Sequence, residues 1–304
     1  MSLRIGVDGG GTKTECILLD GTGAVVARHT APGCNPSLVG PDRARQTLTE
    51  ALEALLAKAP TGSSPPEITA TLLCMAGSSS FWKEAAIALT GVGTVTTAPD
   101  SLPVLELATG GAPGLVLHAG TGSFVTARAP DGSIHYAGGL GWRFGDAGGG
   151  YDLGRRGIAR ALLELQGWAE RTALADALCQ STGAADYAAN SRILYSAVDP
   201  GQRIAAFASS VVDLAGEGCP PAQQAIAQSL SELATLVNAV LPRLFPLATA
   251  GAPVPCGLSG PLLNRPPCLY TLHALAATHA WPVRLQAVAA PPIEGVRRLL
   301  RRTG

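Results

Sequence analysis

The chain has 304 residues, 22 of them basic and 22 acidic, and 47 % of its residues are hydrophobic. This balance excludes the basic surface of a nucleic-acid binder or of a protein held to membranes by lysines and arginines. No stretch approaches the roughly 18 consecutive apolar residues of a membrane span. Because a single core stops growing near about 250–300 residues, we expect a soluble protein of two domains with a ligand cleft between them.

The first part of the chain has the element order βββαβαβα. Short turns at 9–13 and 20–23 join the first three strands into a meander. The expected strands are 3–8, 14–20, 24–30, 67–77 and 92–99, and the expected helices are 42–59, 81–90 and 100–109. The first helix is amphipathic. Its apolar face consists of Ala44, Leu48, Leu52, Leu55 and Leu56.

The same order returns after Gly114 if a helix-rich stretch at about 150–246 is an insertion. The expected strands are 114–120, 124–129, 134–139, 253–260 and 281–288, with helices at 268–279 and 293–302. The turns also correspond, since Gly11-Thr12 matches Gly120-Thr121 and Asp20-Gly21 matches Asp131-Gly132. We therefore expect a duplicated α/β fold with domains at 1–112 and 113–304, and ligands at the strand ends.

Seven cysteines are spread over the chain without a C-x-x-C pair. This pattern predicts reduced thiols rather than disulfides, a zinc site or an iron–sulfur cluster. Cys16, Cys74 and Cys256 stand in apolar runs and are expected to be buried. Residues 1–10 enter a strand without a charged and then apolar leader, so we expect a cytoplasmic protein. A homodimer is compatible with the sequence, which does not decide the oligomeric state.

Three consecutive glycines follow the first strand in IGVDGGGTKT, residues 5–14. Backbone amides of Gly/Thr turns converge on anions, and glycine leaves room for a phosphate. Two such turns in matching positions suit a polyphosphate, although each could be a plain hairpin that needs positive φ. The first is not a Walker loop, because Thr12 stands where Lys is required. It is not a Rossmann fingerprint either, because a strand follows it.

DGGGTKT, AGTGS and GLSG occur in the order of the two phosphate motifs and the adenosine motif of the actin-like ATPase superfamily. Over almost its whole length the chain resembles the BadF/BadG/BcrA/BcrD ATPase family, and especially its N-acetylglucosamine and glucosamine kinases. The resemblance implies a duplicated actin-like, ribonuclease H-like fold that binds ATP and Mg²⁺. Asp8 would organise the Mg²⁺, mostly through water. The implied nucleotide contacts are Gly9, Gly10, Gly11, Thr12, Lys13 and Thr14, then Gly120, Thr121, Gly122 and Ser123, and beside the adenosine Gly257, Ser259 and Gly260.

Phosphoryl transfer to a hydroxyl needs a carboxylate that can take the proton. Asp100 stands where a strand passes into a helix at the predicted cleft. From position alone it could equally be a helix N-cap, and an N-cap aspartate could serve both roles. The resemblance favours Asp100 as the catalytic base.

Further residues match the sugar contacts of these kinases. Asn35 matches a sugar-binding Asn but could be an ordinary turn residue, and Gly77 and Ser78 could form a plain strand-to-helix turn with a serine cap. Asp146 matches the aspartate of the GDEGS motif that holds sugar hydroxyls. Here the stretch reads GDAGG, with Ala147 and Gly149 in place of Glu and Ser. The GGWG motif of these kinases reads GGLG, so Leu140 stands where an aromatic residue contacts the sugar substituent, and Trp142 lies two positions further on. These departures leave the identity of the sugar open.

Four more basic positions and two other functions remain to be interpreted. His118 is expected in the core or behind the site, and Arg143, Arg155 and Arg156 at a solvated helix entrance unless the sugar is an acid. We predict an ATP-dependent kinase acting on an amino sugar, at O6. The alternatives are an ATPase activator of a radical dehydratase, which would need an iron–sulfur cluster, and a sugar-sensing relative without catalysis.

Overall fold

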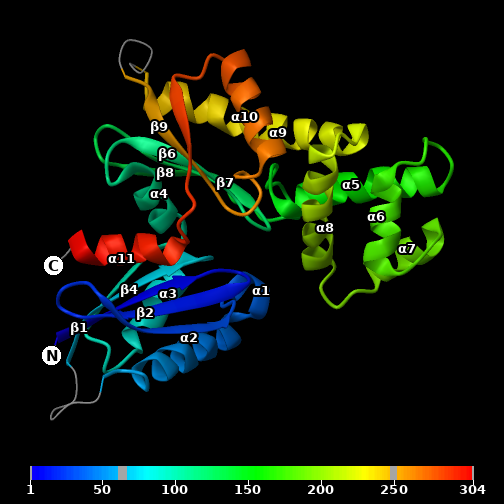
Figure 1. Ribbon diagram of the computed structural model, residues 1–304. Coiled ribbons are helices and arrows are strands. Elements are labelled where there is room, and N and C mark those ends of the chain that lie inside the picture. The colour runs from blue at the N-terminus through cyan, green and yellow to red at the C-terminus, as the bar shows by residue number, and fades with distance from the viewer. Residues whose placement is uncertain (1, 61–66, 247–251, 303–304) are drawn as a thin grey trace. The chain divides into compact units, whose positions relative to one another are not determined.

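The computed structural model describes residues 2–60, 67–246 and 252–302 (Figure 1). The chain divides into two compact units, the first formed by 1–110 with 290–304 and the second by 111–289. Each unit contains one mixed five-stranded sheet. Along the described residues, no helix combines the length and hydropathy needed to cross a membrane.

The sheet of unit 1 has the strand order β3-β2-β1-β4-β5. Its strands are β1 (Ser2–Gly9), β2 (Lys13–Leu19), β3 (Val25–Pro32), β4 (Glu67–Met75) and β5 (Thr94–Pro99). The first three are antiparallel, whereas β4 and β5 run parallel to β1. The helices of this unit are α1 (Pro36–Val39), α2 (Pro41–Leu56), α3 (Ser79–Ile87), α4 (Ser101–Thr109) and α11 (Pro292–Arg302).

The alternation of side chains along β1 determines what covers each face of this sheet. Leu3, Ile5 and Val7 are fully buried in a cluster with α2 and α3. The predicted apolar face of α2 is confirmed, because Ala44, Leu48, Leu52 and Leu55 are buried and Leu56 packs against the cluster. Gly6 points to the opposite face, where a side chain would collide with Val296 of α11.

Unit 2 repeats the topology with the strand order β10-β9-β6-β7-β8. Its strands are β6 (Gly114–Ala119), β7 (Ser123–Arg128), β8 (Ile134–Gly138), β9 (Val254–Ser259) and β10 (Val283–Ala287). Its helices are α5 (Gly150–Leu165), α6 (Ala173–Thr182), α7 (Tyr187–Tyr195), α8 (Pro200–Gly216), α9 (Pro220–Leu244) and α10 (Pro266–Thr278). The predicted duplication is therefore confirmed, because β1 to β5 correspond to β6 to β10 in order and direction.

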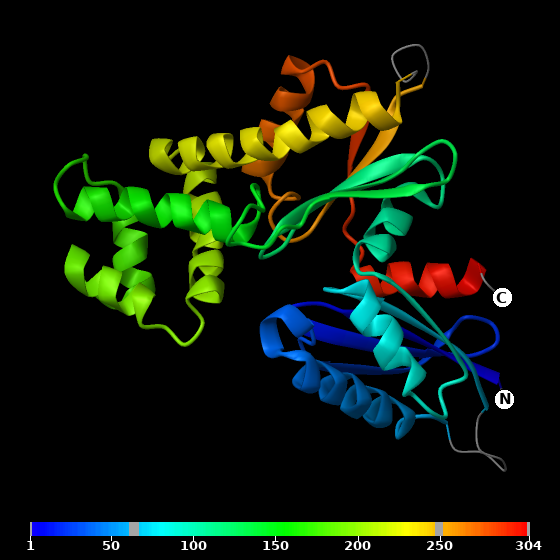
Figure 2. The ribbon, with the colours of Figure 1, turned by 180° about the vertical axis from the view of Figure 1, so that it is seen from behind.

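The helix-rich stretch is inserted between β8 and β9, as expected. Figure 2 shows α6 and α7, in green, standing away from the sheet of their own unit, with α5 and α8 leading to them. Sheet and helices share one apolar cluster, to which β6 contributes Leu115 and Leu117, and α9 contributes Leu233 and Val237. The insertion therefore enlarges the core of unit 2.

The last helix differs from the expected division, which assigned it to the second domain. Ile293, Val296 and Leu300 of α11 are buried against β1, β2 and β4 of unit 1. Burying three such side chains contributes roughly 1.5–3 kcal/mol each. Gly295 permits contact with the backbone of Pro103 in α4, where an added Cβ would lie 2.2 Å from the carbonyl oxygen. Residues 290–304 therefore belong to unit 1.

All seven cysteines are free. Cys16, Cys74 and Cys256 are buried, as the apolar runs predicted. Burial raises the pKa of each of these thiols far above its ordinary value, so they behave as small apolar side chains at neutral pH.

Candidate functional site

In unit 1, two acidic side chains meet at the carboxyl ends of parallel strands. Asp8 of β1 pairs with Cys74 of β4, and Cys74 pairs in turn with Ala98 of β5, two residues before Asp100. Asp8 is only 8 % exposed. Burial first, then the charges of Asp100 and Glu15, raise the pKa of Asp8 to about 7, against the lowering effect of Lys13. The charge of Asp100 therefore makes Asp8 harder to ionise.

The glycine turn after β1 is tied to the segment that follows β3. Gly10 N–H donates to Lys13 O at 2.9 Å, Gly33 N–H to Thr12 O at 3.1 Å, and Cys34 N–H to Gly10 O at 3.1 Å. A Cβ on Gly33 would lie 2.1 Å from the carbonyl oxygen of Gly11, so only glycine permits this approach. Within the described chain, the amides of Gly11 and Thr12 have no hydrogen-bond acceptor. Two free N–H groups on a rigid turn are suited to an anion.

Two residues that follow that turn, Thr14 and Lys13, make side-chain contacts within unit 1. Thr14 is fully buried, and its hydroxyl donates to Pro32 O at 2.9 Å and to Cys34 Sγ at 3.1 Å. Its hydroxyl is thus not directed to a ligand, contrary to its place among the expected nucleotide contacts. Lys13 forms an ion pair with Glu15 at 2.6 Å, but its side chain remains 55 % exposed. Lys13 is therefore still accessible to an anion.

Asp100 precedes α4 without capping it. The residue lies in the αR region with φ −61° and ψ −17°, and its side chain makes no cap hydrogen bond. Asp100 therefore occupies the N-cap position of α4, but its side chain does not cap the helix. Burial raises the pKa of Asp100, opposed by backbone hydrogen bonds. A partly buried carboxylate without a capping role, with a raised pKa, has the properties of a general base.

Asn35, Gly77 and Ser78 lie close to this edge of the sheet. Gly77 has φ +93°, and a Cβ there would lie 2.8 Å from Asn35 Oδ1, so the two residues are in contact. The simpler alternatives also hold, because Asn35 caps α1 by accepting from Ser37 N–H at 3.0 Å and Ser78 caps α3 by accepting from Phe81 N–H. The amide nitrogen of Asn35 has no partner among the described residues.

In unit 2, the matching turn lies at 120–122 between β6 and β7. Gly150 N–H donates to Gly120 O at 2.8 Å and Tyr151 N–H to Thr121 O at 2.9 Å, which fixes the turn to the start of α5. Ser123 is buried, and its hydroxyl donates to Ala147 O at 2.6 Å. A Cβ on Gly122 would collide with Asp146 Oδ2. The turn thus lies directly against the loop that carries Asp146.

The loop that carries Asp146, residues 139–149, is strained and anchored. Asp146 is one of two described non-glycine residues with positive φ, at 65°. Such a conformation costs energy and is characteristic of functional sites. Burial raises the pKa of Asp146, opposed by backbone hydrogen bonds of which that from Gly141 N–H is the strongest. The loop therefore presents a carboxylate that is partly desolvated.

A buried serine from α9 anchors this loop, and no sequence motif indicates it. Ser229 Oγ accepts from Gly148 N–H at 3.0 Å and donates to Asp152 Oδ2 at 2.7 Å. Arg156 Nε donates to the same Asp152 oxygen at 2.9 Å. A residue some 80 positions away thereby fixes the loop beside Asp146. An i to i+4 spacing of Asp152 and Arg156 could have indicated their pairing.

Residues of the predicted adenosine motif adjoin β6. Gly257 lies within β9, and Ser259 pairs with His118. The ring nitrogen Nδ1 of His118 lies 3.3 Å from Ser259 Oγ, the ring stacks on Phe124, and burial lowers the pKa of His118 to about 4. His118 is thus a neutral residue behind the strand ends, as expected. Gly260 has φ +94° and a Cβ there would lie 2.1 Å from Ala119 O.

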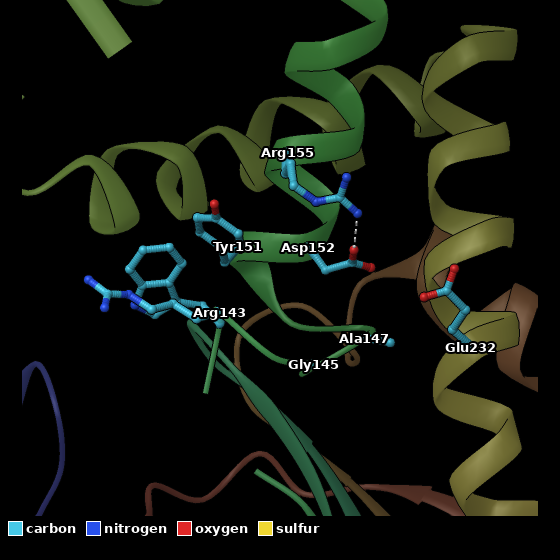
Figure 3. A pocket seen from close by; sticks show the side chains of 8 residues that line it. Arg143, Gly145, Ala147, Tyr151, Asp152, Arg155 and Glu232 are labelled. Carbon is cyan, nitrogen blue, oxygen red and sulfur yellow. Dashed lines mark hydrogen bonds and ion pairs between the residues drawn. The ribbon is translucent and has the colours of Figure 1, made fainter. Parts of the chain in front are cut away.

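A cavity of about 430 Å³ adjoins Asp146 within unit 2. Figure 3 shows Tyr151, Asp152 and Arg155 entering it from the start of α5 and Glu232 from α9. Its lining consists of Trp142, Arg143, Gly145, Ala147, Tyr151, Asp152, Arg155 and Glu232. The expected solvated helix entrance is wrong for Arg156, whose side chain is 15 % exposed and pairs with Asp152 and Glu232.

The residues around Asp8 fit a hydrated Mg²⁺ and a polyphosphate. The negative charges of Asp100 and Glu15 raise the pKa of Asp8, and Lys13, which pairs with Glu15, opposes them. A divalent cation would stabilise the ionised form of Asp8. Across the described residues, no group of three or more His, Cys, Asp or Glu side chains forms a metal site. Mg²⁺ in proteins usually keeps several waters and takes few carboxylates.

Comparison with known proteins identifies the fold. The BadF/BadG/BcrA/BcrD ATPase family matches residues 5–249. A Chromobacterium violaceum structure described as a provisional N-acetylglucosamine kinase is 26 % identical, with a TM-score of 0.76 over 98 % of both chains. A ROK family glucokinase from Streptomyces griseus, 12 % identical over 99 % of this chain and 100 % of its own, has a TM-score of 0.60. The fold is the duplicated actin-like ATPase fold of these sugar kinases.

A curated relative matches part of the sequence. N-acetyl-D-glucosamine kinase of Dictyostelium discoideum is 30 % identical over 163 residues, which cover 49 % of this chain. The match spans about half, 51 %, of the length of that relative.

Proposed function

The chain belongs to the BadF/BadG/BcrA/BcrD ATPase family, and on that premise we propose that it is a kinase that transfers the γ-phosphate of ATP to O6 of an amino sugar, N-acetylglucosamine or glucosamine. The observation that carries the proposal is the pair Asp8 and Asp100, which lie at the carboxyl ends of β1 and β5, on either side of β4. The name of the Dictyostelium relative and that of the Chromobacterium structure support the substrate class.

Asp100 is the proposed base. It takes the proton from the sugar O6 hydroxyl as that oxygen forms a bond to the γ-phosphorus, while the bond from phosphorus to the bridging oxygen breaks and ADP leaves. A raised pKa makes the Asp100 carboxylate a stronger base, which favours transfer of the proton from the sugar hydroxyl. Asp8 would hold Mg²⁺ through water, and the ion supplies charge neutralisation when bound.

The backbone turns are the proposed phosphate sites. The free amides of Gly11 and Thr12, with Lys13, would contact the β- and γ-phosphates, together with Gly9 and Gly10. Gly120, Thr121, Gly122 and Ser123 would form the second site, and Gly257, Ser259 and Gly260 would lie beside the adenosine. The hydroxyls of Thr14 and Ser123 are left out of this scheme, because both are engaged within their units.

Asn35, Gly77, Ser78 and Asp146 are the proposed sugar contacts. A carboxylate accepts hydrogen bonds from two adjacent hydroxyls, and an asparagine amide can donate to a third. Closure of the two units would exclude water that otherwise hydrolyses ATP. We also propose that the enzyme is cytoplasmic and forms a homodimer.

A coupled assay for ADP release tests the function. The purified chain is offered ATP, Mg²⁺ and a panel of glucosamine, N-acetylglucosamine, N-acetylmannosamine and glucose, with a no-sugar control for ATPase activity. We expect turnover with an amino sugar well above the control and a ³¹P-coupled C6 resonance in the product. ADP release that no sugar stimulates would contradict the proposal, and a phosphate on O1 would contradict the assignment of O6.

A further inference from the structure

We propose that the cavity beside Asp146 is a subsite for a carboxylate carried on the N-acyl or O3 substituent of the sugar, so that the substrate is an acidic amino sugar. The inference rests on the proposed function and specifies its substrate class. The contacts of this one cavity within unit 2 carry it.

The cavity adjoins the proposed sugar contact directly. Gly145 and Ala147, the two neighbours of Asp146 in the chain, both line it. Its volume of about 430 Å³ lies within the range of small-molecule sites, roughly 300–1,000 Å³. A sugar held by Asp146 would therefore have room for a substituent on this side.

The acidic side chains at the cavity use only part of the donor capacity of its arginines. Asp152 accepts from Arg156, Ser229 and Arg155. Arg156 also pairs with Glu232. Neither acid pairs with Arg143, which lines the cavity with Arg155.

The spare hydrogen-bonding capacity belongs to two arginines. Arg155 donates through Nη2 to Asp152 at 2.9 Å, which uses one of its five N–H groups. Its remaining donors, and all those of Arg143, have no acceptor among the described residues. Both side chains are exposed. Guanidinium groups with free donors bind carboxylates in a bidentate manner.

An aromatic wall completes the cavity. The rings of Trp142 and Tyr151 lie 4.8 Å apart at an angle of 43°. The guanidinium of Arg143 lies 5.0 Å from the centre of the Trp142 ring, which holds it at the cavity by a cation–π interaction. The wall offers an apolar surface for the carbon atoms of a substituent, and the arginines offer partners for its charged end.

Ala147 lines the cavity with a small, uncharged side chain. A glutamate at this position would project a third carboxylate toward the cavity and repel an anion. Figure 3 shows Ala147 on the loop opposite Glu232. The short side chain thus preserves the space and adds no negative charge.

Pairs of sugars, one with a terminal carboxylate and one with an alkyl end of similar length, test the subsite. N-succinylglucosamine is compared with N-butyrylglucosamine, and 3-O-carboxymethyl-N-acetylglucosamine with 3-O-propyl-N-acetylglucosamine. We expect kcat/KM of the acidic member to exceed that of its neutral partner by about tenfold or more in at least one pair, and the excess to shrink at high salt.

Two variants at one position separate charge from volume. Ala147→Glu is expected to lower the ratio of acidic to neutral kcat/KM about tenfold, whereas Ala147→Gln, of the same size, leaves the ratio near that of the wild type. Arg155→Gln should also lower the ratio, and Asp152 keeps Arg156 and Ser229 as partners in that variant. Calorimetric titration of the acidic sugars gives the same comparison without turnover.

The outcomes distinguish the two proposals. Phosphorylation of neutral sugars with no preference for acids, or equal ratios in the Glu and Gln variants, overturns the subsite and leaves the kinase intact. No phosphorylation of any amino sugar, acidic or neutral, overturns both.

Discussion

The carboxylate of Asp100 lies close enough to that of Asp8 for its charge to raise the pKa of Asp8, although the two residues are 92 positions apart in the sequence. The parallel strands β1, β4 and β5 bring their carboxyl ends to one edge, and Cys74 lies between the two acids on β4. An uncharged, buried thiol between two carboxylates cannot screen them. The edge is therefore prepared for a cation and a proton, which the following predictions examine.

Asp8→Asn is expected to change how stability depends on pH. The pKa of Asp8 is about 7 in the folded chain, against an ordinary value of 3.8. Between these two pH values Asp8 keeps its proton in the folded chain and has lost it in the unfolded chain. Its contribution therefore falls as pH rises from about 4 to about 7. Between pH 5 and pH 8 the wild type should therefore lose roughly 2–3 kcal/mol more of its unfolding free energy than the variant does.

Urea unfolding of both proteins at pH 5 and pH 8 measures this difference. Mg²⁺ and ATP are left out, so that only the proton is exchanged. The same variant should lose most kinase turnover. An identical pH dependence of stability in the two proteins would show that Asp8 is not desolvated.

Gly33→Ala is expected to disturb the first glycine turn. The added Cβ would lie 2.1 Å from Gly11 O and 2.8 Å from Thr12 N, so the backbone must shift. We expect a loss of about 1–3 kcal/mol of stability and a higher KM for ATP. Gly21→Ala is the control, because nothing lies within 4 Å of its Cβ and its φ is not positive. Equal effects of the two substitutions on thermal stability and on the KM for ATP would argue against this packing.

Ser229→Ala is expected to release the loop that carries Asp146. It removes the acceptor of Gly148 N–H and a donor to Asp152, both buried, and should cost about 1–3 kcal/mol. Under the proposed function the KM for the sugar rises more than the KM for ATP. Ser231→Ala, two positions away on the exposed side of α9, is the matched control. A uniform loss for both substrates would mean that Ser229 has only a structural role.

The order of elements along the chain and the duplication were predictable because both depend on local patterns. Apolar alternation, turn residues such as Gly11-Thr12 and the repeated element order all act over a few residues. The position of α11 was not predictable, since its apolar face fits either unit by composition. Gly6 and Gly295 decide it, and their importance appears only when Val296 and Pro103 are seen against them.

The site was predictable only in part. Asp8 and Asp100 stand at strand ends, and parallel strands bring such ends together. The directions of the Thr14 and Ser123 hydroxyls depend on what each strand packs against, which no motif encodes. Ser229 belongs to a helix without a motif, so its bond to Gly148 had no signal in the sequence. The cavity at Trp142 depends on the path of a glycine-rich loop, which allows many conformations.

The central claim, that Asp100 is the base of a kinase, is tested most directly by Asp100→Asn, which keeps the shape and removes the proton acceptor. ADP release with the best sugar of the panel is measured beside ATP binding by calorimetry. The prediction is a fall of about 10²–10⁴-fold in kcat with ATP still bound at an affinity close to that of the wild type. Turnover at the wild-type rate would contradict the claim.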